Sequence, residues 1–210
     1  MASNGSEPPA RATLPSSTKI LIAGGFGVGK TTMVRSVSDI APLRTEELLT
    51  VASGDVDDLT GVAAKNTTTV ALDFGKISLG DQLMLYLFGT PGQDRFWFMW
   101  DDLAHGALGV VVLADTRRLA DCFAAVDFVE QRGFPFVLAV NLFDEAERYT
   151  TSEVRDALAL SPEIPIVLCD ARERDSGIVV LRTLLEHALQ RLSAPSGPPA
   201  VATDGATRCP

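Results

Sequence analysis

Apolar and polar positions along the chain predict alternating strands and helices. Short apolar runs read as strands buried on both faces, and helical spacing of apolar residues follows them. The expected strands are 19–23, 68–79, 82–88, 107–114, 135–140 and 165–169, and the expected helices are 30–39, 119–132, 152–160 and 178–192. This order predicts one α/β domain with a mostly parallel six-stranded sheet, in which strand 68–79 is antiparallel, and helices on both faces. Ligands of such sheets bind at the carboxyl ends of the strands.

Two terminal segments lack any such period. Residues 1–17 and 194–210 are rich in Ser, Pro, Ala and Gly, a composition typical of disordered tails. Residues 18–193 are expected to form the domain, and its longest interruption is the polar segment 40–67. Loops of that length inside a compact domain are usually functional.

Composition narrows the class of partner. The chain has 210 residues, a hydrophobic share of 46% and a net charge of −9. These values fit one globular domain and argue against nucleic acid, which needs a clustered basic face. Its three scattered cysteines suit neither a disulfide framework nor a zinc site. They indicate that the protein works in the reducing cytoplasm. The longest apolar run, 107–114, is far too short to span a membrane, so we expect no direct membrane insertion.

A glycine-rich loop follows the first expected strand and fits the pattern G-x-x-x-x-G-K-[ST]. Its glycines would let backbone N–H groups surround phosphates, while Lys30 reaches the β- and γ-phosphate oxygens and Thr31 holds Mg²⁺. A chance match in a strand-to-helix turn is the alternative, but the strand before the loop and the helix after it favour phosphate binding. The residues expected to bind the nucleotide phosphates are Gly24, Gly25, Phe26, Gly27, Val28, Gly29, Lys30, Thr31 and Thr32.

Further polar groups lie at other strand ends. They are Thr69 and Asp73 early in strand 68–79, Gly92 and Gln93 after 82–88, Asn141 and Asp144 after 135–140, and Asp170, Ala171 and Arg172 after 165–169. Each also has a plain structural explanation. Pro-Gly marks turns, threonine favours strands, and Asn or Asp after a strand forms a helix-capping turn.

Taken in order, these segments resemble a small Ras-like GTPase over residues 19–193. They are similar to the bacterial MglA-like branch, and within it most similar to the conservon GTPases of actinobacteria. The residues that carry this closer resemblance are 23–32, 88–100 and 115–118.

The resemblance implies roles on the phosphate side of the site. The N–H of Gly92 would sense the γ-phosphate, Gln93 would orient the attacking water, and Lys30 would act with them in catalysis. Thr69 would close over Mg²⁺ beside Thr31, although neighbouring threonines leave its register open by one or two positions.

The resemblance also implies a guanine site. Asn141 and Asp144 match the guanine motif N-K-x-D, in which the aspartate accepts two donors that adenine does not present. The lysine of that motif is Leu142 here, which puts nucleotide affinity in doubt more than nucleotide identity. Asp170, Ala171 and Arg172 take the place of S-A-K, in which the alanine N–H contacts the base oxygen.

The implied ligands are GTP or GDP with Mg²⁺. The implied partners are a roadblock-type regulatory protein and a sensor-kinase-like membrane protein, which would hold a cytoplasmic switch beside the membrane. Composition and spacing show nothing of these partners.

Three departures from the family pattern bear on hydrolysis. The acidic residue that usually begins the switch II motif, and helps to hold Mg²⁺ through water, is Gly89 here, and we hypothesise that Asp73 on the neighbouring strand supplies the missing carboxylate for the metal. Phe26 stands where Ras has glycine and should obstruct both water and an arginine finger. The branch's own arginine is Thr68 here, and because such an arginine contributes about 10³ to 10⁵ in rate, we expect slow turnover. No spacing selects a substitute among Arg44, Arg95 and Arg117.

Two other functions stay open. The chain could be a pseudo-GTPase scaffold, which Phe26, Gly89 and Leu142 favour, or an ATP-using P-loop enzyme. The aromatic segment after Gln93 is likewise open: one helical face would be core, whereas Trp97 and Phe98 could be buried or could form a partner hot spot.

Overall fold

The computed structural model describes residues 16–41, 43–50, 67–80, 83–92, 98–144 and 146–193, with backbone alone for 43–50 and 67–71. Within these residues seven strands form one sheet in the order β2-β3-β4-β1-β5-β6-β7. They are β1 (Ser16–Ala23), β2 (Leu43–Thr50), β3 (Thr67–Leu79), β4 (Leu83–Gly89), β5 (Ala107–Ala114), β6 (Phe136–Asn141) and β7 (Ile166–Cys169).

The pairing agrees with the expected fold class. Strand β1 is parallel to β4 and β5, and β5, β6 and β7 continue the parallel part of the sheet. Strand β3 is antiparallel to β4, as expected for strand 68–79. The mostly parallel α/β sheet is therefore confirmed.

The structure adds a strand that the sequence pattern did not predict. Leu43–Thr50, within the expected loop 40–67, forms edge strand β2 and pairs antiparallel with β3. Its sequence does not alternate strictly between apolar and polar residues, so the strand depends on its partner rather than on its own pattern. Strand β1 also begins at Ser16, inside the expected tail, because Ser16 and Ser17 pair with β4. Residues 51–66 lie outside the described part.

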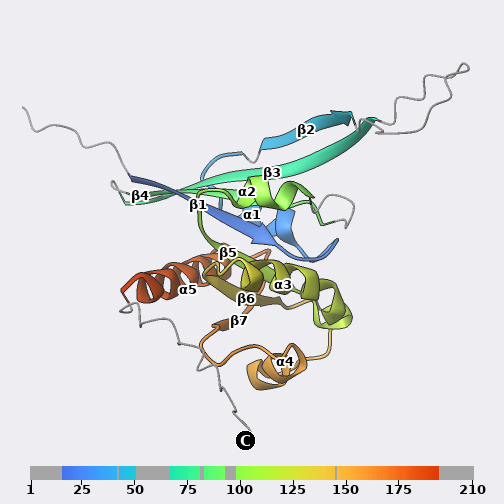
Figure 1. The fold of residues 1–210 in the computed structure, drawn as a ribbon, viewed down its shortest axis with the longest axis vertical. Helices are drawn as coiled ribbons and strands as arrows, with labels where there is room; N and C mark the ends of the chain where they lie inside the picture. Colours follow the sequence, from blue (N-terminus) through green and yellow to red (C-terminus); the bar gives the residue numbers. More distant parts are fainter. Residues whose placement is uncertain are drawn as a thin grey trace, which may run out of the picture.

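Helices cover both faces of the sheet (Figure 1). They are α1 (Lys30–Val37), α2 (Trp100–Ala104), α3 (Phe123–Gln131), α4 (Thr151–Ala157) and α5 (Arg174–Ser193), with a 3₁₀ helix, η2, at Thr116–Cys122. Helices α1 and α5 share one apolar core with the sheet, and α2, α3 and α4 share the other.

The two cores follow from the strand period. Along β1, Ile20 and Ile22 join the core of α1 and α5, whereas Leu21 and Ala23 join the core of α2, α3 and α4. Successive side chains of a strand point to opposite faces, so a continuous apolar run is buried on both sides. The rigid sheet then holds the loops at its carboxyl edge in place.

The aromatic segment divides as the helical-face argument expects. Trp100 is buried, and its indole N–H donates to Pro91 O over 3.3 Å, which ties α2 to the loop after β4. Phe98 is 62% exposed, which excludes simple burial of this ring in the isolated chain. Trp97 lies outside the described residues.

Candidate functional site

The phosphate loop joins β1 to α1 and closes around its own lysine. Lys30 Nζ donates to Gly24 O over 2.8 Å and to Gly25 O over 2.7 Å. The loop needs glycine at Gly29, where φ is +107° and an added Cβ would lie 2.6 Å from Asn141 Nδ2. The loop thus closes around Lys30 and packs against Asn141, while its role in holding phosphates stays a prediction.

Burial changes the proton affinity of the lysine. Lys30 is only 8% exposed, and this burial lowers the pKa of its ammonium to about 8, although the nearby Asp73 carboxylate raises it. The lysine therefore titrates within reach of ordinary assay conditions.

A hydroxyl and a carboxylate meet beside the loop. Thr31 Oγ1 donates a short hydrogen bond to Asp73 Oδ2. Asp73 pairs with Gly89 across β3 and β4, and an added Cβ at Gly89 would lie 3.1 Å from Asp73 Cβ. The Asp73 side chain thus lies beside Gly89 and within hydrogen-bond distance of Thr31. The two oxygen donors fit Mg²⁺, which prefers one or two protein oxygens together with phosphates and water.

These groups line a cavity of about 320 Å³. Its walls come from the loop, the start of α1, β3 and the segment after β4. The residues that line it are Phe26, Gly27, Gly29, Lys30, Thr31, Thr32, Asp73, Thr90, Pro91 and Gly92. Gly92 is packed so closely that an added Cβ would lie 2.5 Å from Lys30 Nζ and 3.0 Å from Gly25 O.

Asn141 connects this cavity to the expected base site. Its Nδ2 donates to Val28 O over 2.9 Å, and its Oδ1 accepts from the N–H of Ala171 over 3.0 Å. The side chain is buried, so it joins three loops at the carboxyl edge of the sheet. The N–H of Ala171, expected to contact a base oxygen, is engaged by Asn141 in this structure.

Asp144, Asp170 and Arg172 form one ion-pair cluster. Arg172 Nη1 and Nη2 donate to the two carboxylate oxygens of Asp144, each over 2.9 Å. The same guanidinium donates from Nε and Nη2 to Asp170 over 2.9 and 2.7 Å. Arg172 lowers the pKa of both carboxyls, mainly by hydrogen bonding. The sequence predicted all three as residues of the base site, but it did not predict the ion pairs between them.

The side chains of two expected site residues are not placed by the described part of the structure. Gln93 lies outside the described residues. Thr69 is four residues before Asp73 in β3, roughly 13 Å along the strand, and its backbone pairs with Leu48. Its side chain also lies outside the described part, so its role in holding metal stays a prediction.

Two neighbouring arginines after β5 are held in different ways. Arg117 is bound to Asp115 and lies over the Phe143 ring, 3.7 Å from its centre. Arg118, which sequence reasoning missed, donates to Phe26 O over 2.8 Å and so contacts the phosphate loop directly. It lies in the 115–118 segment, but no local spacing distinguishes it from its neighbour. The side chains of Arg44 and Arg95 lie outside the described residues.

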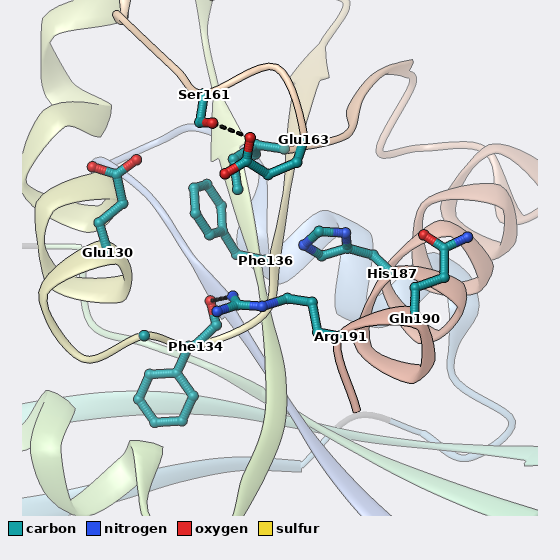
Figure 2. Close-up of a pocket in the computed structure, with 10 residues that line it drawn as sticks. Glu130, Phe134, Phe136, Ser161, Glu163, His187, Gln190 and Arg191 are labelled. Atoms are coloured by element: carbon teal, nitrogen blue, oxygen red, sulfur yellow. Dashed lines mark hydrogen bonds between the residues drawn. The ribbon is translucent and has the colours of Figure 1, made fainter. Parts of the chain in front are cut away.

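A second cavity, of about 630 Å³, lies at the other end of β6 (Figure 2). Figure 2 shows lining side chains converging from α3, from the start of β6, from the 161–164 loop and from α5. Within the described residues, the buried His187 Nε2 has no hydrogen-bond partner, and burial lowers the pKa of this imidazole. None of the expected site residues lines this cavity, although it is larger than the cavity at the phosphate loop.

The fold and the phosphate loop define a P-loop nucleotide-binding protein with the architecture of a G domain. A family model described as "conserved hypothetical ATP binding protein" matches residues 22–191. The chain belongs to that family.

Two relatives are distant in sequence. The Ras-related protein RABC2a of Arabidopsis thaliana is 27% identical over 192 residues, which cover 86% of this chain and 80% of that protein. An uncharacterized protein of Methanocaldococcus jannaschii is 27% identical over 138 residues, which cover 65% of this chain and 76% of that protein.

Solved structures agree on the fold. The G domain of the T. maritima FeoB iron transporter matches with a TM-score of 0.54 at 19% identity, over 84% of this chain and 99% of that domain. The FeoB G domain of Methanococcus jannaschii has the same TM-score at 16% identity, over 83% and 98%. The larger cytosolic domain of the T. maritima protein reaches 0.59 at 18% identity, over 82% of this chain but only 64% of that one.

Proposed function

We propose that this protein is a GTP-binding molecular switch with slow, partner-stimulated hydrolysis of GTP to GDP and phosphate. The observation that carries the proposal is the grouping of Lys30, Thr31, Asp73 and Gly92 around one cavity. Asn141, at the start of the loop that contains Asp144, donates a hydrogen bond to the phosphate loop beside this cavity. In G domains the same two regions bind the phosphates and select the base.

The residues around the phosphate loop suit a nucleotide that carries a γ-phosphate. Gly92 lies against Lys30 and Gly25, so a γ-phosphate arriving at the lysine would meet the loop after β4 first. A phosphate that displaces or orders this loop would give the protein two conformations for a partner to distinguish. Gln93, next in the chain, would orient the water that attacks the γ-phosphate.

Magnesium belongs to the same proposal. Thr31 and Asp73 would hold Mg²⁺ through oxygen, with Thr69 completing the set when its segment closes. The bound ion would neutralise charge that develops on the phosphates.

The choice of base needs its own argument, because the family description names ATP. Asp144 supports guanine. A carboxylate can accept two parallel hydrogen bonds from the N1–H and 2-amino groups of guanine, whereas adenine has no such pair of donors on that edge. We therefore assign guanine, and the competition assay described below tests it against the alternative of an ATP-using enzyme.

Slow hydrolysis follows from the loop residue Phe26. Its side chain is 64% exposed at the rim of the cavity, where it would restrict both the attacking water and any partner arginine. The same features support a second candidate, a pseudo-GTPase scaffold that binds nucleotide, or none, without turnover. Phe26, Gly89 and Leu142 each depart from the pattern of active enzymes.

The partners are proposed from resemblance. We place the chain in the MglA-like branch, beside a roadblock-type regulator and a sensor-kinase-like membrane protein in a signalling complex. The exposed Phe98, next to the segment that includes Gln93, is a suitable anchor for such a partner. No helix among the described residues is long and apolar enough to cross a membrane, so membrane contact through a partner fits this placement.

Competition and turnover assays test the proposal. Labelled GDP bound to the wild-type protein with Mg²⁺ should be displaced by GTP and GDP, but not by ATP, at similar concentrations. Asp144→Ala should remove that preference while phosphate binding remains. Equal competition by ATP would exclude the guanine assignment. Single-turnover hydrolysis, measured with and without a roadblock-type partner, then separates the switch from the scaffold, which never hydrolyses.

A further inference from the structure

The Asp144 carboxylate, which we propose to bind guanine, is paired in this structure with Arg172 of the same chain. Arg172 presents two parallel N–H groups to Asp144, and both donor–acceptor distances are 2.9 Å. A guanidinium and the N1–H, 2-amino edge of guanine offer a carboxylate the same pattern of two planar donors. Only one such edge can lie against the two oxygens in this end-on geometry.

We propose that Arg172 is an internal competitor for guanine: it occupies Asp144 in the nucleotide-free protein and must leave before the base can bind. The inference rests on the proposed function, because it concerns the same Asp144. It adds a residue that weakens guanine-nucleotide binding, because the free protein must first release Asp144 from Arg172.

The second carboxylate makes the exchange possible at low cost. Arg172 keeps its Nε and Nη2 bonds to Asp170 when it releases Asp144, so the guanidinium is never left unpaired. The backbone N–H of Arg172 also donates to Asp170 Oδ1 over 2.9 Å, which anchors the start of the side chain. Arg172 therefore stays bound to Asp170 throughout, and only its contact with Asp144 is exchanged for guanine.

Exposure gives the side chain room to move. Arg172 is 56% exposed and Asp144 is 75% exposed, whereas Asp170 is 26% exposed. The outer contact to Asp144 is thus the more accessible to water and to an incoming base. Exposed ion pairs are individually weak, so the competition should change affinity only a few-fold.

Binding of labelled GDP to the full chain tests the inference. Arg172→Ala should bind GDP about three- to fivefold more tightly than wild type, the range expected for loss of an exposed competing ion pair. Its affinity for ADP should not change, so guanine selectivity should rise. The difference from wild type should shrink at high salt, because salt screens exposed charges. Arg172→Lys should be intermediate, since an ammonium cannot form the paired contact.

Arg148 provides a matched control. It acts on Asp144 and Asp170 through its charge, and it is not assigned to the site. If Arg148→Ala tightened GDP binding as much as Arg172→Ala, the effect would come from the loss of positive charge in general, and direct competition by Arg172 would be refuted. Arg172→Gln, which keeps an amide donor near both carboxylates, serves if the alanine variant fails to fold.

Two failures are distinguishable. Wild-type protein that selects GDP over ADP, with an Arg172→Ala variant that binds GDP equally or more weakly, would overturn the competition and leave the proposed function standing. Wild-type protein that does not distinguish GDP from ADP would instead refute the guanine site, and the inference with it.

Discussion

At the scale of single residues, Lys30 holds a charge in a buried position. Its two hydrogen bonds go to carbonyl oxygens of its own loop, and burial lowers the pKa of its ammonium to about 8. Because phosphates favour the charged form, nucleotide binding and protonation of Lys30 are linked.

This linkage predicts a pH dependence of GDP affinity. Below about pH 8 the free protein already carries the proton, so affinity should be nearly flat. Above that pH the free lysine is neutral and must take up a proton on binding, so affinity should fall by up to about tenfold between pH 8 and 9. Titration with labelled GDP from pH 7 to 9 measures the fall. Lys30→Arg, which stays charged, should show none, and a fall of equal size in that variant would contradict the assignment.

Asp73 makes a second prediction at this scale. Removal of the carboxylate that accepts from Thr31 should weaken Mg²⁺-dependent GDP binding by about 10- to 100-fold, the cost usual for partners of metal ligands. Asp73→Ala is compared with wild type over a Mg²⁺ titration and in EDTA. The two proteins should converge in EDTA, and unchanged Mg²⁺ dependence in the variant would disprove the role.

Phe26 tests the steric explanation for slow turnover. Phe26→Gly should raise the single-turnover rate about tenfold to a hundredfold, the scale on which small displacements of reacting groups change rates. The ring is 64% exposed, so its loss should leave the core unchanged, which a thermal melt checks. If the variant were no faster than wild type, the bulk of Phe26 would not explain slow hydrolysis, and the absence of an arginine at Thr68 would be the remaining explanation.

At the scale of elements, the contact between α1 and α5 joins the two halves of the site. Helix α1 continues from the phosphate loop, and α5 follows the Asp170–Arg172 segment. An added Cβ at Gly177 of α5 would lie 2.4 Å from Val37 Cγ1 of α1. Both residues are buried, so the two helices approach closely because Gly177 has no side chain.

This contact reverses the usual effect of glycine-to-alanine substitution in a helix. Helix propensity alone would favour alanine by about 1 kcal/mol, whereas overpacking of a filled core costs about 1–3 kcal/mol. Gly177→Ala should therefore lower the free energy of unfolding in a denaturant titration. Val37→Ala is the matched partner: the double variant should be more stable than the sum of the two single changes predicts. Simple additivity would contradict the close contact.

At the scale of the whole molecule, bound nucleotide should stabilise the fold. A ligand at 100 times its dissociation constant adds about 2.7 kcal/mol, which corresponds to a rise of roughly 5–11 °C in melting temperature for a chain of this size. GDP with Mg²⁺ should produce this rise, ADP at the same concentration a much smaller one, and EDTA should reduce it. An equal rise with ADP would favour the ATP alternative.

The sequence alone established the local features. The phosphate loop is contiguous, so its glycines, Lys30 and Thr31 are recognisable without any long-range contact. Continuous apolar runs likewise identified the central strands, and Ala107–Ala114 is the strand expected from its run. The order of these elements, with Asn141 and Asp144 at a strand end, was enough to predict the fold class and candidate base site.

Only the tertiary structure decided how distant segments meet. Strand β2 depends on pairing with β3, and Asp73 faces Gly89 because of the register between β3 and β4. Arg118 contacts the phosphate loop, and Arg172 pairs with Asp144, across 92 and 28 residues respectively. Such contacts are set by strand register and loop approach rather than by any period or motif. Local chemistry is therefore readable along the chain, whereas the partner of each charged group is decided by the folded edge of the sheet.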